Sequence, residues 1–309
     1  MTRYVLRRLL QLIPVFFGTT FLIYVLVWAV PGDPFSGKCG QAACPAAYIA
    51  KMTEEFHLGD NIFVQYIKYL GQLFSGNWGE TFNGNSVGEL IGNAYPTTLK
   101  LALVAVAIEA IIGLSAGVLT GLRGKGFLDN LVLVSTTFLI SLPVFVTAIV
   151  LQLMFGANGF GIIDASVPDD PGISDLIIPG FALGSLSMAY VARLSRSSIA
   201  ENRHADYVRT AIAKGQPNSR VVGVHLLRNS VIPVLTFLGT DLGALMGGAI
   251  VTEGVFNING LGGLIFRGIQ NRESATVVGV VVLLVVVYLL MSLLVDLLYA
   301  VLDPRIRYD

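Results

Sequence analysis

Long runs of apolar residues constrain the fold of this chain more than any other feature. An α-helix needs about 20 such residues to cross the roughly 30 Å hydrocarbon core of a bilayer, where only helices and closed barrels satisfy their backbone hydrogen bonds. Five runs reach that length, at residues 9–30, 101–121, 131–155, 231–251 and 277–301. A sixth, 176–192, is shorter and contains Pro179, yet it carries no charge. The sequence therefore predicts an all-α polytopic membrane protein with six transmembrane helices.

The composition agrees with this class and disfavours others. Charged residues make up 13% of the chain, about half of the roughly 25% found in soluble domains. Lys+Arg and Asp+Glu both total 20, so no excess of positive charge indicates a nucleic-acid binder. Two cysteines and three histidines supply little material for a metal enzyme. The first apolar run is also longer than the about 7 to 15 residues of a secretory signal, so we expect it to remain as the first span.

The distribution of basic residues predicts the orientation, because cytoplasmic loops retain Lys and Arg. With the N-terminus inside, the inner segments hold 14 of the 20 basic residues. The outer loop between the third and fourth spans has four aspartates and no Lys or Arg. We therefore expect both termini in the cytoplasm, and three regions: residues 1–30 with the first helix, an extracytoplasmic domain at 31–95, and a core of five helices at 96–309. The core includes a basic cytoplasmic loop at 193–230.

The sequence offers no convincing enzyme motif of two common kinds, a hydrolase elbow and a phosphate-binding loop. Residues 113–117 fit the G-x-S-x-G pattern of hydrolases, which needs a strand-turn-helix and a histidine base. Ser115 lies in a predicted membrane helix and no histidine falls within a span, whereas Gly113, Gly117 and Gly121 repeat every four residues and favour close helix packing. There is also no G-x-x-x-x-G-K-[ST] phosphate loop. If ATP drives this protein, another subunit binds it.

Three acids lie at membrane depth, where ionisable residues are functional candidates. They could serve a proton or cation pathway, or they could hydrogen-bond polar neighbours. We favour the second interpretation for Glu109 and for Asp296, which is close to a helix end. Asp241 stays open, because it lies among glycines that suit either close packing or the lining of a path. Asp241, Gly243 and Gly247 are therefore the candidates for a translocation path.

Cys39 and Cys44 are five positions apart in the predicted outer domain. A metal or redox pair would need further ligands such as a nearby histidine. A local disulfide is favoured over free thiols by the oxidising compartment.

Residues 204–215 of the cytoplasmic loop read as a helix that ends at Gly215, with Pro217 just beyond as a helix breaker. Tyr207, Ala211 and Lys214 are spaced to share one face. Such a helix could lie on anionic lipid as a basic surface helix. It could also be a rigid contact for a partner.

The sequence of this loop resembles the coupling loop of ABC-importer permeases of the dipeptide/oligopeptide/nickel class, and specifically their first permease. The resemblance rests on residues 206–215, 225–229 and 232–234, with further blocks at 30–34, 253–262 and 302–307. Arg209, Thr210 and Ala211 replace the Glu-Ala-Ala of the general coupling motif, in the manner of the peptide class.

The resemblance implies a type I ABC-importer permease that moves its substrate by alternating access in a prokaryotic inner membrane. Its partners would be a second homologous permease, two ATP-binding subunits and an extracytoplasmic substrate-binding protein. ATP and Mg would be bound by the ATPase subunits, with no cofactor in this chain and no ATP site of its own. The residues implied in coupling to the ATPase are Asp206, Tyr207, Arg209, Thr210, Ala211, Lys214 and Gly215.

Dipeptides or short oligopeptides are the expected substrate, although the class also includes importers of nickel, glutathione and haem. A proton-coupled secondary transporter that uses Glu109 or Asp241 is an alternative, but it gives no account of the basic loop ending at Gly215. A membrane-embedded enzyme or a structural scaffold is a further alternative. The sequence argues against it, because it offers no usable set of catalytic residues.

Overall fold

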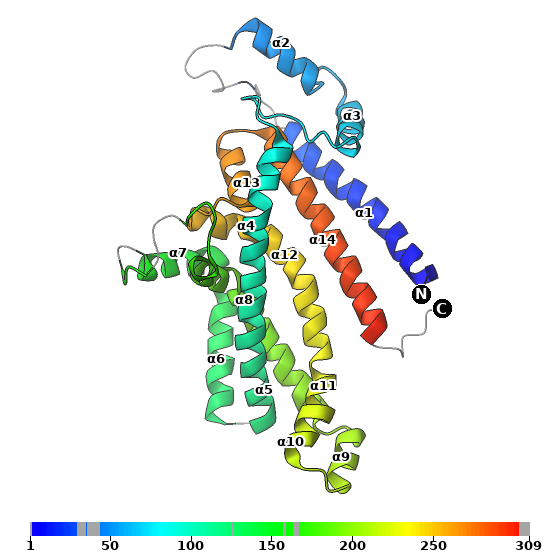
Figure 1. The fold of residues 1–309 in the computed structure, drawn as a ribbon, viewed down its shortest axis with the longest axis vertical. Helices are drawn as coiled ribbons and strands as arrows, with labels where there is room; N and C mark the ends of the chain where they lie inside the picture. Colours follow the sequence, from blue (N-terminus) through cyan, green and yellow to red (C-terminus); the bar gives the residue numbers. More distant parts are fainter. Residues whose placement is uncertain are drawn as a thin grey trace.

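The computed structural model describes residues 2–29, 35, 44–124, 126–156, 159–162 and 167–302. Regular structure in these ranges is helical, apart from one isolated antiparallel bridge between Glu80 and Ser86. The elements, shown in Figure 1, are α1 (Thr2–Trp28), α2 (Ala46–Glu55), α3 (Ile62–Phe74), α4 (Val87–Ile108), η1 (Glu109–Gly113), α5 (Leu114–Arg123), α6 (Phe127–Ser141), α7 (Val144–Phe155), α8 (Ile173–Asn202), α9 (Asp206–Ala213), α10 (Asn218–Arg220), η2 (Val221–Leu226), α11 (Leu227–Ser230), α12 (Ile232–Val255), α13 (Leu261–Gln270) and α14 (Ser274–Leu302).

Five helices of the described chain are long and apolar enough to cross a membrane. They are Val5–Trp28, Val87–Arg123, Ile173–Asn202, Ile232–Val255 and Ser274–Leu297. The third predicted span, at 131–155, is not one straight helix, because α6 and α7 meet at an angle of 103°. Pro143 lacks a backbone N–H and forces Leu142 before it into an extended conformation, with ψ of 129°. In Figure 1, α7 consequently runs across the bundle axis.

The second span is a single 37-residue helix in which α4, the π-helical turn η1 and α5 follow without a break. It packs closely along α8. A Cβ on Gly113 would lie 2.7 Å from the Met188 carbonyl oxygen, and one on Gly117 would lie 2.5 Å from the Ala192 carbonyl oxygen. Since real Cβ atoms do not approach a backbone so closely, these positions require glycine. The prediction that this glycine repeat serves helix packing is confirmed.

The predicted span at 176–192 is part of α8, which continues through Pro179 and runs on to Asn202. The helix α8 therefore includes residues 193–202 of the segment that was predicted as the basic loop, 193–230. Arg193 and Arg196 belong to α8 and bond to α6: Arg193 donates to Thr136 at 3.1 Å, and Arg196 makes a two-pronged contact with Asp129, one arm of which is 2.8 Å long.

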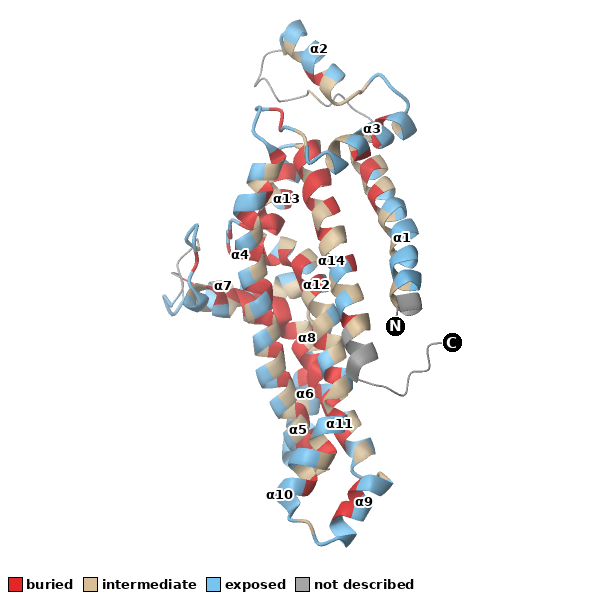
Figure 2. Cartoon of the chain, turned by 45° about the vertical axis from the view of Figure 1, so that its right-hand side comes forward, coloured by how far each residue is buried: buried red, intermediate tan, exposed pale blue. Residues whose placement is uncertain are grey.

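The buried core lies where α4, α8 and α12 meet, with α13 and α14 covering one side. Figure 2 shows buried residues concentrated along these helices, whereas α1 is largely exposed and packs against α14. Arg8 on α1 donates to Asp296 on α14 at 3.2 Å. This ion pair supports the interpretation of Asp296 as a residue bonded to a polar neighbour.

The segment between α1 and α4 contains α2 and α3, and it lies at the opposite end of the molecule from α9 (Figure 1). Asn61 caps helix α3, because its side chain accepts from Phe63 N at 3.0 Å. The α3 face packs on α1, where the Thr20 hydroxyl lies 2.7 Å from the Tyr66 hydroxyl. Cys39 and the blocks at 30–34 and 303–307 lie outside the described residues, so the predicted Cys39–Cys44 bridge does too.

Candidate functional site

The predicted coupling residues lie together at one end of the molecule, on α9 and the turn that follows it (Figures 1 and 2). Helix α9 has eight residues, and three short elements, α10, η2 and α11, return the chain from it to α12. A sharp turn between Asn202 and Asp206 separates it from α8. The Tyr207 hydroxyl crosses this turn and donates to Asn202 Oδ1 at 2.8 Å. The long α8 helix is thus tied directly to α9.

One face of α9 is buried within the chain. Val208 and Ala211 are 2% and 4% exposed, and they pack against Ile199 of α8 and against Val221 and Leu226 of η2. This apolar cluster, of the five residues just named, fixes the position of α9 relative to α8. Burial of a Val side chain contributes about 1.5 kcal/mol or more, so the cluster makes α9 a rigid projection of the bundle.

The opposite face of α9 is exposed, and it carries polar and charged groups. Its exposed members include six of the predicted coupling residues: Asp206, Tyr207, Arg209, Thr210, Lys214 and Gly215. The seventh, Ala211, was expected to share a face with Tyr207 and Lys214. Ala211 lies in the buried cluster, whereas Tyr207 and Lys214 are exposed.

The turn after α9 depends on Gly215. Its φ is +71°, a conformation that residues other than glycine and asparagine rarely adopt. The backbone makes both bonds of a Schellman cap: Gly215 N donates to Ile212 O at 2.9 Å, and Gln216 N donates to Ala211 O at 3.2 Å. In the part of the chain that the structure describes, no atom lies within 4 Å of the position that a Cβ would take. The requirement for glycine is therefore conformational and not steric.

Further contacts fasten this end of the molecule to the long helices. Arg203 donates to the Leu122 carbonyl at 3.0 Å, which joins the end of α8 to the end of α5. The Ser198 hydroxyl donates to the Ser230 carbonyl at 3.0 Å, which joins α8 to α11. A force applied to α9 would therefore reach α5, α8 and α12 together.

A second buried arrangement organises the chain between α12 and α13. Glu253 is fully buried and accepts from the Thr98 hydroxyl at 2.7 Å and from Gly263 N at 2.8 Å. The Thr98 hydroxyl in turn accepts from Leu261 N at 2.7 Å. A carboxylate and a hydroxyl on other helices thus cap the first amides of α13, where negative charge is favoured.

The three candidates for a translocation path are not equivalent. A Cβ on Gly243 would lie 3.2 Å from Met291 Cβ on α14, so this glycine serves helix packing. Gly247 has nothing within 4 Å. Asp241 is half-buried and lies within hydrogen-bonding reach of Ser187 on α8 and of Glu109 in η1. Sequence reasoning did not anticipate that these two acids meet.

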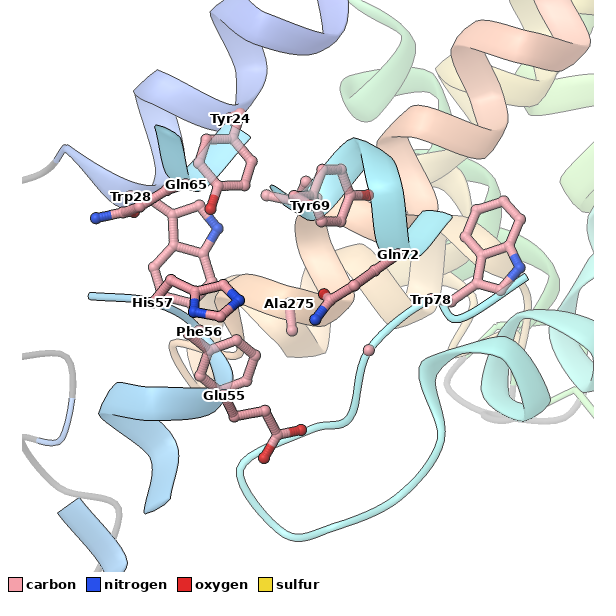
Figure 3. A pocket seen from close by; sticks show the side chains of 12 residues that line it. Tyr24, Trp28, Glu55, Phe56, His57, Gln65, Tyr69, Gln72, Trp78 and Ala275 are labelled. Carbon is pink, nitrogen blue, oxygen red and sulfur yellow. The ribbon is translucent and has the colours of Figure 1, made fainter. Parts of the chain in front are cut away.

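A small cavity lies at the other end of the molecule, between α1, α3 and α14 (Figure 3). Aromatic side chains line it, among them Tyr24, Trp28 and Tyr69. Burial raises the pKa of the Tyr69 hydroxyl, which has no hydrogen-bond partner among the described residues. Burial also raises the pKa of Glu55 at the rim, and repulsion from Glu80 adds to that effect.

Residues 113–308 match the family described as binding-protein-dependent transport system inner membrane component, and residues 1–102 match its N-terminal counterpart. The chain belongs to this family. It is therefore a multi-pass membrane component of a transport system and not a catalytic subunit.

Similar proteins extend over the full length. The chain is 33% identical to the di/tripeptide transport system permease protein DppB of Pseudomonas aeruginosa, with all of both chains covered. It is 34% identical to the oligopeptide transport system permease protein OppB of Haemophilus influenzae, again over both whole chains. A solved amino acid ABC transporter shares the fold, with a TM-score of 0.51 at 20% identity over 71% of this chain and 94% of the other.

Proposed function

We propose that this chain is a permease subunit of an ATP-driven, binding-protein-dependent importer of dipeptides or short oligopeptides. The names of its full-length relatives support this substrate class. The observation that carries the proposal is the construction of α9, whose inner face is locked to α8 while its outer face presents charged and polar groups. Such a projection is suited to receive a partner's motion and pass it to the membrane helices.

In this proposal the outer face of α9 contacts one ATP-binding subunit. The contact is made by Asp206, Tyr207, Arg209, Thr210, Lys214 and the turn at Gly215. Ala211 acts by holding α9 in place. ATP and Mg belong to the partner subunits, and a second permease of the same family completes the path through the membrane. ATP-driven closure of the ATPase pair would then move α9 and α8 as one body.

The proposed orientation places α9 and both termini in the cytoplasm, because the α9 end of the molecule is rich in Arg and Lys. Residues 31–95, with α2 and α3, then form the extracytoplasmic domain. Together with α13, that domain would face the substrate-binding protein. Residues 1–30 supply the first helix, and residues 96–309 supply the permease core.

Uptake of a labelled dipeptide tests the proposal. Cells that lack this chain should lose ATP-dependent uptake, and the intact chain should restore it. Competition with an unlabelled tripeptide should lower uptake of the label, whereas nickel, glutathione and haem should not. Uptake that survives inactivation of the partner ATPase but collapses with an uncoupler would contradict the proposal in favour of proton-driven transport.

A further inference from the structure

Two carboxyl groups from different helices meet inside the membrane-spanning part of the chain. Glu109 is the first residue of η1, and its side chain is 0% exposed. Asp241 lies midway along α12, and the two carboxyl groups are within hydrogen-bonding reach of each other. Glycine at position 184 of α8 makes room for this contact, because a Cβ there would lie 2.7 Å from Glu109 Oε1.

No donor on the described chain neutralises this pair. Both carboxyl oxygens of Glu109 and Oδ2 of Asp241 are buried without a hydrogen-bond donor. The hydroxyl of Ser187 is the polar group that reaches Asp241 from α8. A hydroxyl carries no positive charge, so it cannot balance two carboxylates.

Charged groups on the packed helices are placed elsewhere. Lys100 of α4 bonds to Asp170, Arg193 and Arg196 of α8 bond to α6, and Arg267 of α13 bonds to Asn259. Helix α7 has no charged residue. The other titratable groups on these helices, none of them an interaction partner of the pair, are Glu89, Tyr95, Arg123, Asp175, Tyr190, Glu201, Arg228, Glu253, Tyr288 and Asp296.

Two ionised carboxylates so close together would repel each other and would both lose their hydration. One proton removes both costs, since a neutral carboxyl donates a short, charge-assisted O–H···O⁻ bond to its ionised partner. We propose that Glu109 and Asp241 form a proton-binding site that holds one shared proton and thereby joins the 87–123 helix to α12.

The site has a mechanical consequence. Glu109 belongs to the helix that packs along α8 through the glycine repeat, and Asp241 belongs to the helix that α11 connects to the α9 region. The shared proton acts as a bond between these two helices. Its loss would place two like charges in contact and push the helices apart. The π-helical turn that begins at Glu109 agrees with a functional position, because such turns are frequent at functional sites.

Infrared spectroscopy of the purified, assembled transporter tests the site without requiring transport. We expect a carboxylic-acid carbonyl band near neutral pH that shifts on exchange into D₂O. The band should be lost in Glu109→Gln and in the double variant Glu109→Gln with Asp241→Asn. Asp296→Asn is the matched control, because Asp296 is paired with Arg8 and should contribute no acid band. If the wild-type and double-variant spectra show the same carboxylic-acid bands, the proposal is overturned.

A second measurement keeps the test decisive if one variant assembles poorly. The melting temperature of the wild-type complex should fall at alkaline pH as the shared proton is lost. The Asp241→Asn variant should show a smaller fall, because an amide in place of one carboxyl leaves at most one charge. An equal fall in both proteins would contradict the proposal. Neither measurement depends on the substrate, so failure here is distinguishable from failure of the proposed transport function.

Discussion

The turn at Gly215 offers the sharpest perturbation of the proposed coupling element. Replacement by Val forces a β-branched side chain into a backbone with φ of +71°. A left-handed conformation costs an L-residue roughly 1–2 kcal/mol, and a β-branched residue tolerates it least. No atom of the described residues lies within 4 Å of the new Cβ, so no steric term is added. The Schellman cap after α9 should therefore weaken by about this amount.

A free-energy difference of about 1.4 kcal/mol changes an equilibrium constant tenfold. The cost of the left-handed backbone therefore lowers the population of the native turn roughly fivefold to thirtyfold relative to other conformations of the same segment. Gly215→Asn is the matched control, since asparagine tolerates the left-handed region while placing a side chain of similar size in the same space. We expect peptide uptake by Gly215→Val to fall by about that factor, and uptake by Gly215→Asn to stay within about twofold of wild type.

The assay is initial-rate uptake of a labelled dipeptide in cells that express each variant at equal membrane levels. Quantification of the chain in the membrane fraction controls for insertion, which should be unaffected because the turn lies outside the spans. Equal uptake by the Val and Asn variants would refute the reasoning, whether both were active or both inactive. In either case, tolerance of a left-handed backbone at position 215 would not be the property on which uptake depends.

Three other changes follow from specific contacts. Gly117→Leu should lower the melting temperature and the amount of assembled protein, since overpacking costs about 1–3 kcal/mol or more. Gly247→Ala is the control, because no atom of the described residues lies within 4 Å of its new Cβ, and it should leave the melting temperature unchanged. Glu253→Ala should destabilise the protein by about 1–3 kcal/mol for each buried donor left without an acceptor. Denaturation followed by the fluorescence of the aromatic residues measures this loss. A loss no larger than the one caused by an alanine substitution on the surface would count against the capping role. The pKa of Glu55 is higher in the folded protein than in the unfolded chain. Ionisation of this carboxyl therefore lowers the free energy of unfolding as the pH rises above the unfolded-state pKa. Glu55→Gln should therefore melt at a higher temperature than wild type near pH 7, and the difference should vanish near pH 4; an equal difference at both would contradict it.

Most of the membrane architecture follows from patterns that a sequence states directly. Apolar runs of sufficient length predicted four of the five straight spans, and the shorter run at 176–192 predicted the fifth. The four-residue glycine repeat predicted close packing with a neighbouring helix. The exception is the third run, where hydropathy gave the right extent but not the 103° bend. Pro143 was visible in the sequence. Its effect depends on how α6 and α7 pack, because neighbouring helices can satisfy the groups that a proline frees.

The candidate site was only partly predictable. Gly215 and the end of α9 follow from local rules of helix termination. The orientation of α9 does not, because Val208 and Ala211 become the inner face only when α8 and η2 supply a surface to pack on. The Glu253 cap and the Glu109–Asp241 contact join residues that are far apart in the sequence. Thr98 and Glu253, for example, are separated by 155 positions. No local pattern encodes such contacts.

Site-directed cross-linking between this chain and the partner ATPase tests the central claim most directly. Thr210→Cys places a thiol on the exposed face of α9, and Ser174→Cys places one on the exposed far end of α8 as a control. The account predicts that a thiol-to-amine cross-linker joins the ATPase to the Thr210 variant, with a yield that changes on addition of ATP, and not to the Ser174 variant. Absence of any cross-link from Thr210 in an assembled, transport-competent complex would contradict the role of α9 as the coupling element.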